Sequence, residues 1–222
     1  MRLDRLIGKW GEWGKRRVRE VFEAGGVSVN GVVEEKAASL VGKFDRVEVC
    51  GKVVQANTRR VVILNKPSGV VSATKDEEHP TVISLIDRPW AAELHLAGRL
   101  DRYTTGLMVL TNDGEYSESL TDPVNKIGKR YLVTTDGKIR PVVVEAFESG
   151  MWFAKEKMTT TPAIVEILGT SDCRLTIFEG KHHQVKRMFA QFELKVVALH
   201  REAIGEIELP GDLLFGEWRE ID

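Results

Sequence analysis

The sequence predicts an α+β fold in two parts, a small head of helices and short strands followed by a larger domain on a mixed, mainly antiparallel sheet. Its 222 residues exceed the ~150 residues of a typical domain. A hydrophobic content of 42% is enough to build a core. From residue 61 onward, many strand-like segments alternate with few helical ones, which favours an antiparallel or mixed sheet over a doubly wound parallel one. We place the head at 1–52, a linker at 53–60 and the larger domain at 61–222.

The head begins with two helical patterns between residues 3 and 23. In the second, 15–23, apolar residues recur at three- and four-residue spacing on one side and basic residues occupy the other. Two alternating segments then flank Asn30-Gly31, the strongest short hairpin signal, and residues 45–49 alternate again. Two helices and a small sheet are therefore expected.

Charge is distributed unevenly along the chain. Residues 1–60 hold 13 Lys and Arg against 8 Asp and Glu, whereas the remainder holds 19 against 25. A basic head on an acidic body suggests that the head contacts a polyanion. Ordinary charge scatter is the alternative reading.

The larger domain is expected to contain several strands and a few helices. A buried strand at 61–64 runs into a turn at 65–69. Further strands are expected at 130–135, 163–168, 174–178 and 195–199, and helices at 80–86, 115–120 and 182–192.

The segment 98–114, GRLDRYTTGLMVLTNDG, carries the first candidate site residue. Asp101 lies between Arg99 and Arg102, ahead of a Thr-Thr-Gly turn and an apolar run. Neighbouring cations favour the charged form of a carboxylate, which can then serve as a nucleophile or a base.

Several classes of chemistry lack their sequence signatures. The motifs GxSxG, GxGxxG and GxxxxGK[ST] are absent, and the histidines show no metal-ligand spacing. We therefore expect no metal and no cofactor. Two distant cysteines, Cys50 and Cys173, favour a reduced, cytoplasmic setting. With no apolar run near ~18 residues and no signal-like start, we expect no membrane partner.

A second informative segment is 179–189, in which Lys186 stands among other cations on a helical pattern. Alone, it is typical of a solvated amphipathic helix. Tyr131 begins a strand, and alone it is more often a half-buried packing residue than a surface for stacking a base.

The head resembles the S4 RNA-binding domain in residues 2–6, 16–18, 26–31 and 45–49. The resemblance implies that Lys15, Arg16, Arg17 and Arg19 contact RNA as a patch, and cations on one helix face suit phosphates. Gly14 stands where relatives usually have a capping serine. Trp10 and Trp13 stand where they have polar residues, and these rings either stack on RNA or pack under the head.

The complete chain resembles the pseudouridine synthases of the RsuA type, which isomerise a specific uridine in ribosomal RNA. The matching stretches, in the family's order, are LNKPSG at 64–69, the loop at 98–114, KRYLV at 129–133, EGKHHQVKRMFA at 179–190 and VALHREAIG at 197–205.

The resemblance implies roles for individual residues. Asp101 matches the catalytic aspartate, which attacks C1′ of the ribose or acts as a base at C2′. Tyr131 matches the tyrosine that stacks on the target base, and Lys186 the basic residue paired with the aspartate. Arg99 is expected at the target strand, with Leu199 and Arg201 at the pocket.

The implied activity is cofactor-free conversion of a uridine to pseudouridine after base flipping. Residues 183–188 look most like the enzymes that act on 16S rRNA, so 16S rRNA or a small-subunit assembly intermediate is the expected partner of a monomeric chain. Three alternatives are a 23S rRNA enzyme, a non-catalytic RNA-binding or assembly factor, and a hydrolase that uses Asp101. The hydrolase would lack a metal or a second acid.

Overall fold

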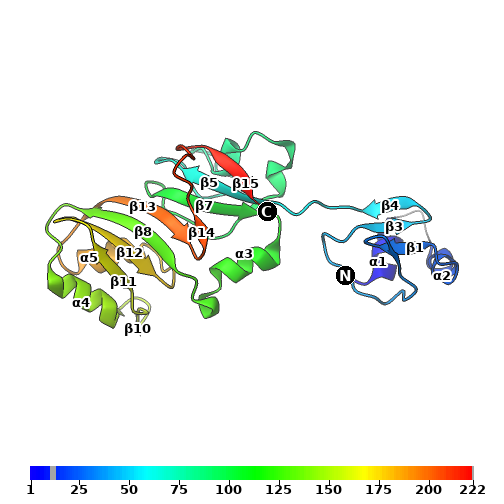
Figure 1. Cartoon of the computed structure of the whole chain (residues 1–222), viewed down its shortest axis with the longest axis horizontal. Coiled ribbons are helices and arrows are strands. Elements are labelled where there is room, and N and C mark those ends of the chain that lie inside the picture. Colours follow the sequence, from blue (N-terminus) through cyan, green and yellow to red (C-terminus); the bar gives the residue numbers. More distant parts are fainter. Residues whose placement is uncertain (11–13, 222) are drawn as a thin grey trace. The chain divides into compact units, whose positions relative to one another are not determined.

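The chain forms two compact units, Met1–Arg59 and Arg60–Asp222, in a computed structural model (Figure 1). The structure describes residues 1–10 and 14–221, and only the backbone of Lys15. The expected tryptophan at position 13 therefore lies outside the described residues.

The first unit packs two helices on a four-stranded antiparallel sheet. The helices are α1 (Leu3–Lys9) and α2 (Lys15–Glu23), and the strand order is β2-β1-β3-β4. The strands are β1 (Val27–Val29), β2 (Val32–Val33), β3 (Val47–Val49) and β4 (Lys52–Gln55). Helix α2 has the bounds that its periodicity predicted, and its N-cap residue, Gly14, provides no side-chain cap.

Residues 53–55 belong to the sheet of the first unit and not to a linker. They lie in β4, which pairs antiparallel with β3. Cys50 and Gly51 both have positive φ, 49° and 77°, and turn the chain back. A cysteine seldom takes this conformation, so the sequence did not suggest a hairpin there.

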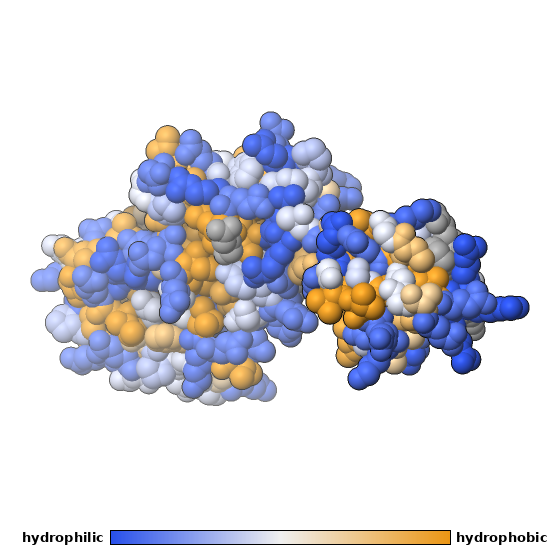
Figure 2. Space-filling view, turned by 45° about the vertical axis from the view of Figure 1, so that its right-hand side comes forward, coloured by the Kyte–Doolittle hydropathy of each residue, from blue (hydrophilic) through white to orange (hydrophobic). Residues whose placement is uncertain are grey.

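The core of the first unit is small and its surface is mixed. Apolar side chains of both helices and of β1 and β3 form the core, including Leu3, Ile7 and Val47, each 0% exposed. Figure 2 shows apolar surface beside hydrophilic side chains on the visible face of this unit.

The second unit is built on a nine-stranded sheet. Its main path runs β11-β12-β8-β13-β7-β5-β15, with β6 beside β7 and β14 beside β13. Only β13 and β7 pair in parallel among the described strands, which confirms the predicted mixed, mainly antiparallel sheet. The strands are β5 (Val61–Lys66), β6 (His95–Leu96), β7 (Thr105–Thr111), β8 (Lys129–Thr135), β11 (Ile164–Ile167), β12 (Asp172–Ile177), β13 (Val196–Ile204), β14 (Ile207–Glu208) and β15 (Trp218–Ile221).

Three α-helices accompany this sheet: α3 (Gly114–Thr121), α4 (Pro141–Ser149) and α5 (Gln184–Ala190). Short 3₁₀ turns lie at Ile83–Leu85, Pro89–Glu93 and Pro123–Asn125, and β9 (Trp152–Phe153) pairs with β10 (Met158–Thr159). Helices α4 and α5 share a core with the sheet, where the rings of Phe147 and Phe189 meet edge to face at 4.9 Å. No helix in the described part of the chain is long and apolar enough to cross a membrane.

Two expected helices are shorter than predicted. Residues 80–86 form only the 3₁₀ turn Ile83–Leu85, because the backbone is already extended at Ile86, with ψ 99°, and again at Arg88, which precedes Pro89. Helix α5 begins at Gln184 and not at residue 182, because His183 has a left-handed backbone with φ 51°.

Candidate active site

Asp101 lies in a turn that its own backbone and residues 69–72 hold in place. We call residues 98–104 the aspartate loop. The Asp101 carbonyl accepts a hydrogen bond from the Thr104 amide at 3.0 Å, and the Leu100 amide and carbonyl both bond the Ser72 hydroxyl at 3.1 and 2.7 Å. The Gly69 amide donates to the Arg102 carbonyl at 2.9 Å. The loop is therefore fixed by residues 30 or so positions earlier in the chain.

A buried lysine lies directly beneath the aspartate loop. Lys66 is 0% exposed, and its ammonium donates to the carbonyls of Pro67, Arg102 and Thr104 at 3.1, 2.9 and 2.9 Å. Burial lowers the pKa of Lys66 to about 8, and the nearby Asp101 charge partly opposes that shift. The KPSG turn therefore supplies a support for the loop, which the sequence indicated only as a turn.

Gly106 allows the loop to run into the sheet. A Cβ at this position would lie 2.3 Å from the Arg201 carbonyl oxygen, and the backbone has φ 101°. Strands β7 and β13 pair in parallel at this point, with Gly106 opposite Arg201. Only glycine fits so close an approach, so the Thr-Thr-Gly turn is a packing requirement of the site.

Helix α5 brings a cation to Asp101 across 85 positions of sequence. The Lys186 ammonium donates to Asp101 Oδ2 at 2.7 Å, and the two side chains are 36% and 30% exposed. His183 Nε2 lies 3.4 Å from the other oxygen, Oδ1. The carboxylate thus has a lysine at one oxygen and an imidazole at the other.

The arginines beside Asp101 in sequence do not form its ion pairs in the part of the chain that the structure describes. Arg102 turns away, donating to the Gly69 carbonyl at 3.1 Å and lying 2.8 Å from His79 Nε2. Arg99 is exposed at the cavity rim. Arg102 lies in the turn after Asp101, where Gly69 and His79 hold its guanidinium, so adjacency in the sequence does not bring this cation to the carboxylate.

Five of the six residues expected at the site converge on one hollow. A cavity of about 100 Å³, here called the central cavity, lies between the aspartate loop, α5 and the sheet. Tyr131 on β8 is 8% exposed and lines it, and Leu199 on β13 lies alongside. The lining includes Arg99, Asp101, Tyr131, Lys186 and Leu199.

A second hollow of about 600 Å³, the basic hollow, adjoins the first. Both are lined by Arg99, Asp101 and Tyr131. Arg201 lines only the basic hollow; it is 3% exposed and donates to the Leu107 carbonyl at 2.8 Å. Burial and then the charge of Arg201 lower the pKa of Lys129, which also lines the hollow.

Several residues at the site were not singled out by the sequence. His183 touches Asp101. Its backbone is left-handed, and its ring stacks on that of His182 at 3.8 Å. Glu179 and Gln184 are buried and joined by a 2.9 Å hydrogen bond that holds the turn before α5. In the sequence, the only sign of this buried pair is that polar residues flank the apolar pattern of the helix.

Arg187, next to Lys186, anchors helix α5. Its guanidinium binds both oxygens of Glu156 at 2.8 and 2.7 Å and lies over the Phe153 ring. It also lowers the pKa of Glu156 to about 2. The cations of this helix are thus divided between anchoring α5 and facing Asp101.

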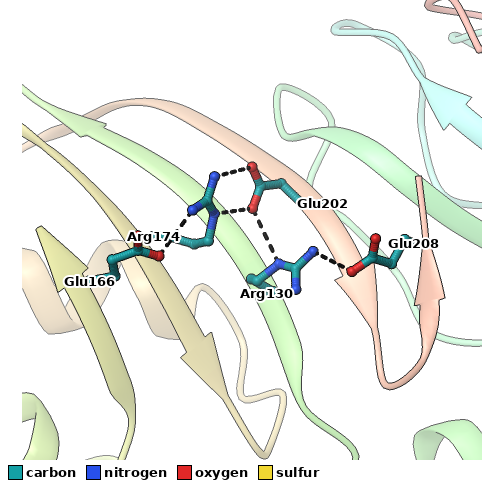
Figure 3. Close-up of polar contacts among 5 residues, drawn as sticks. All are labelled: Arg130, Glu166, Arg174, Glu202 and Glu208. Carbon is teal, nitrogen blue, oxygen red and sulfur yellow. Dashed lines mark hydrogen bonds and ion pairs between the residues drawn. The ribbon is translucent and has the colours of Figure 1, made fainter. Parts of the chain in front are cut away.

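The opposite face of the sheet holds a separate ionic network (Figure 3). Arg174 binds Glu166 at 3.0 Å and Glu202 at 2.7 Å. Arg130 lies 3.4 Å from Glu202 and 2.8 Å from Glu208. These five side chains come from five neighbouring strands, and each arginine has two acidic partners.

Within residues 1–10 and 14–221, no group of three or more histidine, cysteine or acidic side chains is placed to hold a metal ion. The site is therefore described by one carboxylate, its two basic neighbours, a buried tyrosine and a basic approach.

Such a site is that of an enzyme that acts on an anionic substrate. The sequence matches the RNA pseudouridylate synthase family over residues 60–191, and the chain belongs to that family.

Among its relatives is the ribosomal small subunit pseudouridine synthase A of Pseudomonas aeruginosa, 43% identical over 100% of this chain and 97% of that protein. The protein of the same name from Escherichia coli K12 is 42% identical over 100% of this chain and 96% of its own length. A solved pseudouridylate synthase matches with a TM-score of 0.72 and 35% identity, covering 100% of this chain and 96% of that one.

Proposed function

We propose that this chain converts a specific uridine of 16S ribosomal RNA to pseudouridine, with Asp101 as the catalytic residue. The observation that supports this most strongly is the 2.7 Å pair between Asp101 and Lys186 at a cavity lined by Tyr131. The family assignment supplies the reaction class, and the names of the relatives point to the small subunit.

The reaction breaks the bond between uracil N1 and ribose C1′ and forms a bond between C5 and C1′. The proton at C5 is lost and N1 gains one, so nothing is oxidised or reduced. A positioned, ionised carboxylate can start the cleavage as a nucleophile at C1′ or as a base at C2′. Lys186 holds the Asp101 carboxylate in place through their 2.7 Å hydrogen bond.

The target base must leave its stack to reach Asp101, at a cost of a few kcal/mol. Stacking on Tyr131 would return about 1–3 kcal/mol. The basic hollow beside the cavity, lined by Arg99, Lys129 and Arg201, suits the phosphates of the strand that carries the flipped nucleotide.

The first unit is proposed to be an S4-like module that holds the RNA. Its helix α2 presents Arg16 and Arg19, which are 95% and 83% exposed and pair with Glu20 and Glu23 one turn later. Phosphates would compete with these exposed glutamates, because such surface pairs are worth little. Arg17 lies on the same helix, and Lys15 begins it.

We propose that the chain acts as a monomer. The cytoplasm, where a bacterial small subunit is assembled, is the proposed location.

Purified chain incubated with unmodified 16S rRNA, 23S rRNA and small-subunit assembly intermediates tests the proposal. We expect pseudouridine at one position of 16S rRNA, in free RNA or in an intermediate. Product on 23S rRNA alone would contradict the small-subunit assignment, and RNA binding without product on any of them would favour an assembly factor. Arg16→Ala with Arg19→Ala in the same assay should raise KM without lowering kcat if α2 contacts the RNA.

A further inference from the structure

A third hollow continues the site on the side away from the basic hollow. It has a volume of about 600 Å³, and we call it the apolar groove. It shares Thr104, Lys186 and Leu199 with the central cavity. Of the residues that the structure describes, none lines both the apolar groove and the basic hollow. The central cavity therefore lies between a basic approach and an apolar one.

The groove is made by the end of α5, the start of β13 and the aspartate loop. Its apolar lining comes from Leu194, Val196, Val197 and Leu199. Val197 is 57% exposed, so this surface is open to solvent. Lys186 and Lys195 stand at the groove with one acid, Glu193, which leaves a net positive charge.

Tyr103 forms a wall of this groove, two positions after Asp101. Tyr103 is 69% exposed, although it lies within the hydrogen-bonded turn from Asp101 to Thr104. The Arg102 guanidinium carbon lies 5.4 Å from the ring centroid, and Arg102 is itself held by the Gly69 carbonyl. The ring is thus an exposed aromatic surface on a rigid support.

We propose that the apolar groove binds the base of an unpaired nucleotide next to the target uridine, with Tyr103 as its stacking surface. This inference rests on the proposed function and adds a specificity-determining residue to it. An apolar groove with an exposed aromatic ring and two lysines fits a base with its phosphate better than it fits an apolar peptide. Its continuity with the central cavity through Lys186 and Leu199 places that base one nucleotide or so from the flipped uridine.

The geometry also gives the strand a path. An extended strand crossing the three hollows would meet phosphate-binding cations first, then Asp101 with Tyr131, then Tyr103. Bases on both sides of the target would leave the helical stack. Stacking on Tyr103 would offset part of the free-energy cost of opening that stack.

Steady-state kinetics on unmodified small-subunit RNA test this proposal. Tyr103→Ala should raise KM about tenfold, the fold-change of about 1.4 kcal/mol of lost stacking, and lower kcat by less than about threefold. Tyr103→Phe and Tyr103→Trp should keep wild-type KM because they keep the ring. Trp152→Ala is the matched control: Trp152 is 57% exposed on the same unit and outside the three hollows, and its loss should change nothing.

A fluorescence experiment reports stacking directly. Once the modified position is known, two synthetic RNAs are made. One carries 2-aminopurine at the nucleotide before the target uridine, and the other carries it at the nucleotide after. Wild type and Tyr103→Phe should quench one of the two probes on binding, and Tyr103→Ala should not. Wild-type KM for Tyr103→Ala, or equal quenching by that variant, would overturn the inference. A wild-type protein that makes no pseudouridine would instead contradict the proposed function.

Discussion

The two faces of the central sheet use the same strands for different purposes. Strand β8 points Tyr131 into the central cavity and its neighbour Arg130 to the opposite face. Strand β13 likewise gives Leu199 and Arg201 to the cavity side and Glu202 to the other. Successive residues in a strand point to opposite faces, so the two environments are separated by a single residue.

The difference lies in how charges are paired. On the opposite face, Arg130 and Arg174 are each bound by acids from adjacent strands, with every partner supplied by the sheet itself. On the cavity side, Asp101 is met by Lys186 from a helix and lies beside a hollow. Ion pairs between strands stabilise the order of the strands in the sheet. An ion pair beside a cavity can open, so that one of its members contacts a substrate instead.

Asp101→Asn is expected to have the largest effect. The amide keeps the shape of the loop but is neither a nucleophile nor a base, so kcat should fall by about 10⁴-fold or more. RNA affinity, measured by filter binding, should stay within about threefold of wild type. Activity of the Asp101→Asn protein would show that the reaction does not use the Asp101 carboxylate at the cavity.

Lys186→Met should have the next largest effect. It leaves Asp101 without its 2.7 Å partner, and we expect kcat to fall by about 10²-fold, as when one electrostatic partner is removed from an active site. Lys186→Arg keeps the charge and should retain more activity than Lys186→Met. Equal activity of the two variants would show that the charge of residue 186 is not used.

Glu202→Gln tests the opposite face. It weakens the pairs to Arg130 and Arg174, and the free energy of unfolding should fall by about 1 kcal/mol, because the acid is partly exposed. The value of kcat should match wild type. Urea denaturation and single-turnover kinetics measure the two quantities, and a tenfold loss of kcat at unchanged stability would mean that the two faces are coupled.

Lys66 should show its effect only above about pH 8, as a pH dependence of stability. Its pKa is about 8 in the folded chain against 10.5 ordinarily, so the unfolded chain binds the extra proton between these values. The free energy of unfolding of wild type relative to Lys66→Met should therefore rise as pH increases from about 8 to 10.5. A flat difference across that window would show that the lysine is not buried as a cation.

The sequence predicted the elements whose periodicity is strong. Helix α2 and strands β5, β8 and β12 follow their apolar patterns closely. Helix α4 was missed because Val142, Val143 and Val144 are β-branched and typical of strands, although Pro141 fits a helix start. Strand β15 is short and pairs with β5 across the chain, a contact that local sequence does not encode.

The site was predicted in part, through the family resemblance. Asp101, Tyr131 and Lys186 converge as expected, although the residues alone left Lys186 on a solvated helix and Tyr131 in packing. The contact of His183 depends on a left-handed backbone, and the support from Lys66 depends on complete burial. Neither property follows from residue type or spacing.

The most direct test is to map pseudouridines in ribosomal RNA from a bacterium that lacks this chain. We predict that one position of 16S rRNA loses the modification, that wild-type protein restores it, and that Asp101→Asn protein, expressed to the same level, does not. An unchanged 16S map, or full restoration by Asp101→Asn, would contradict the account.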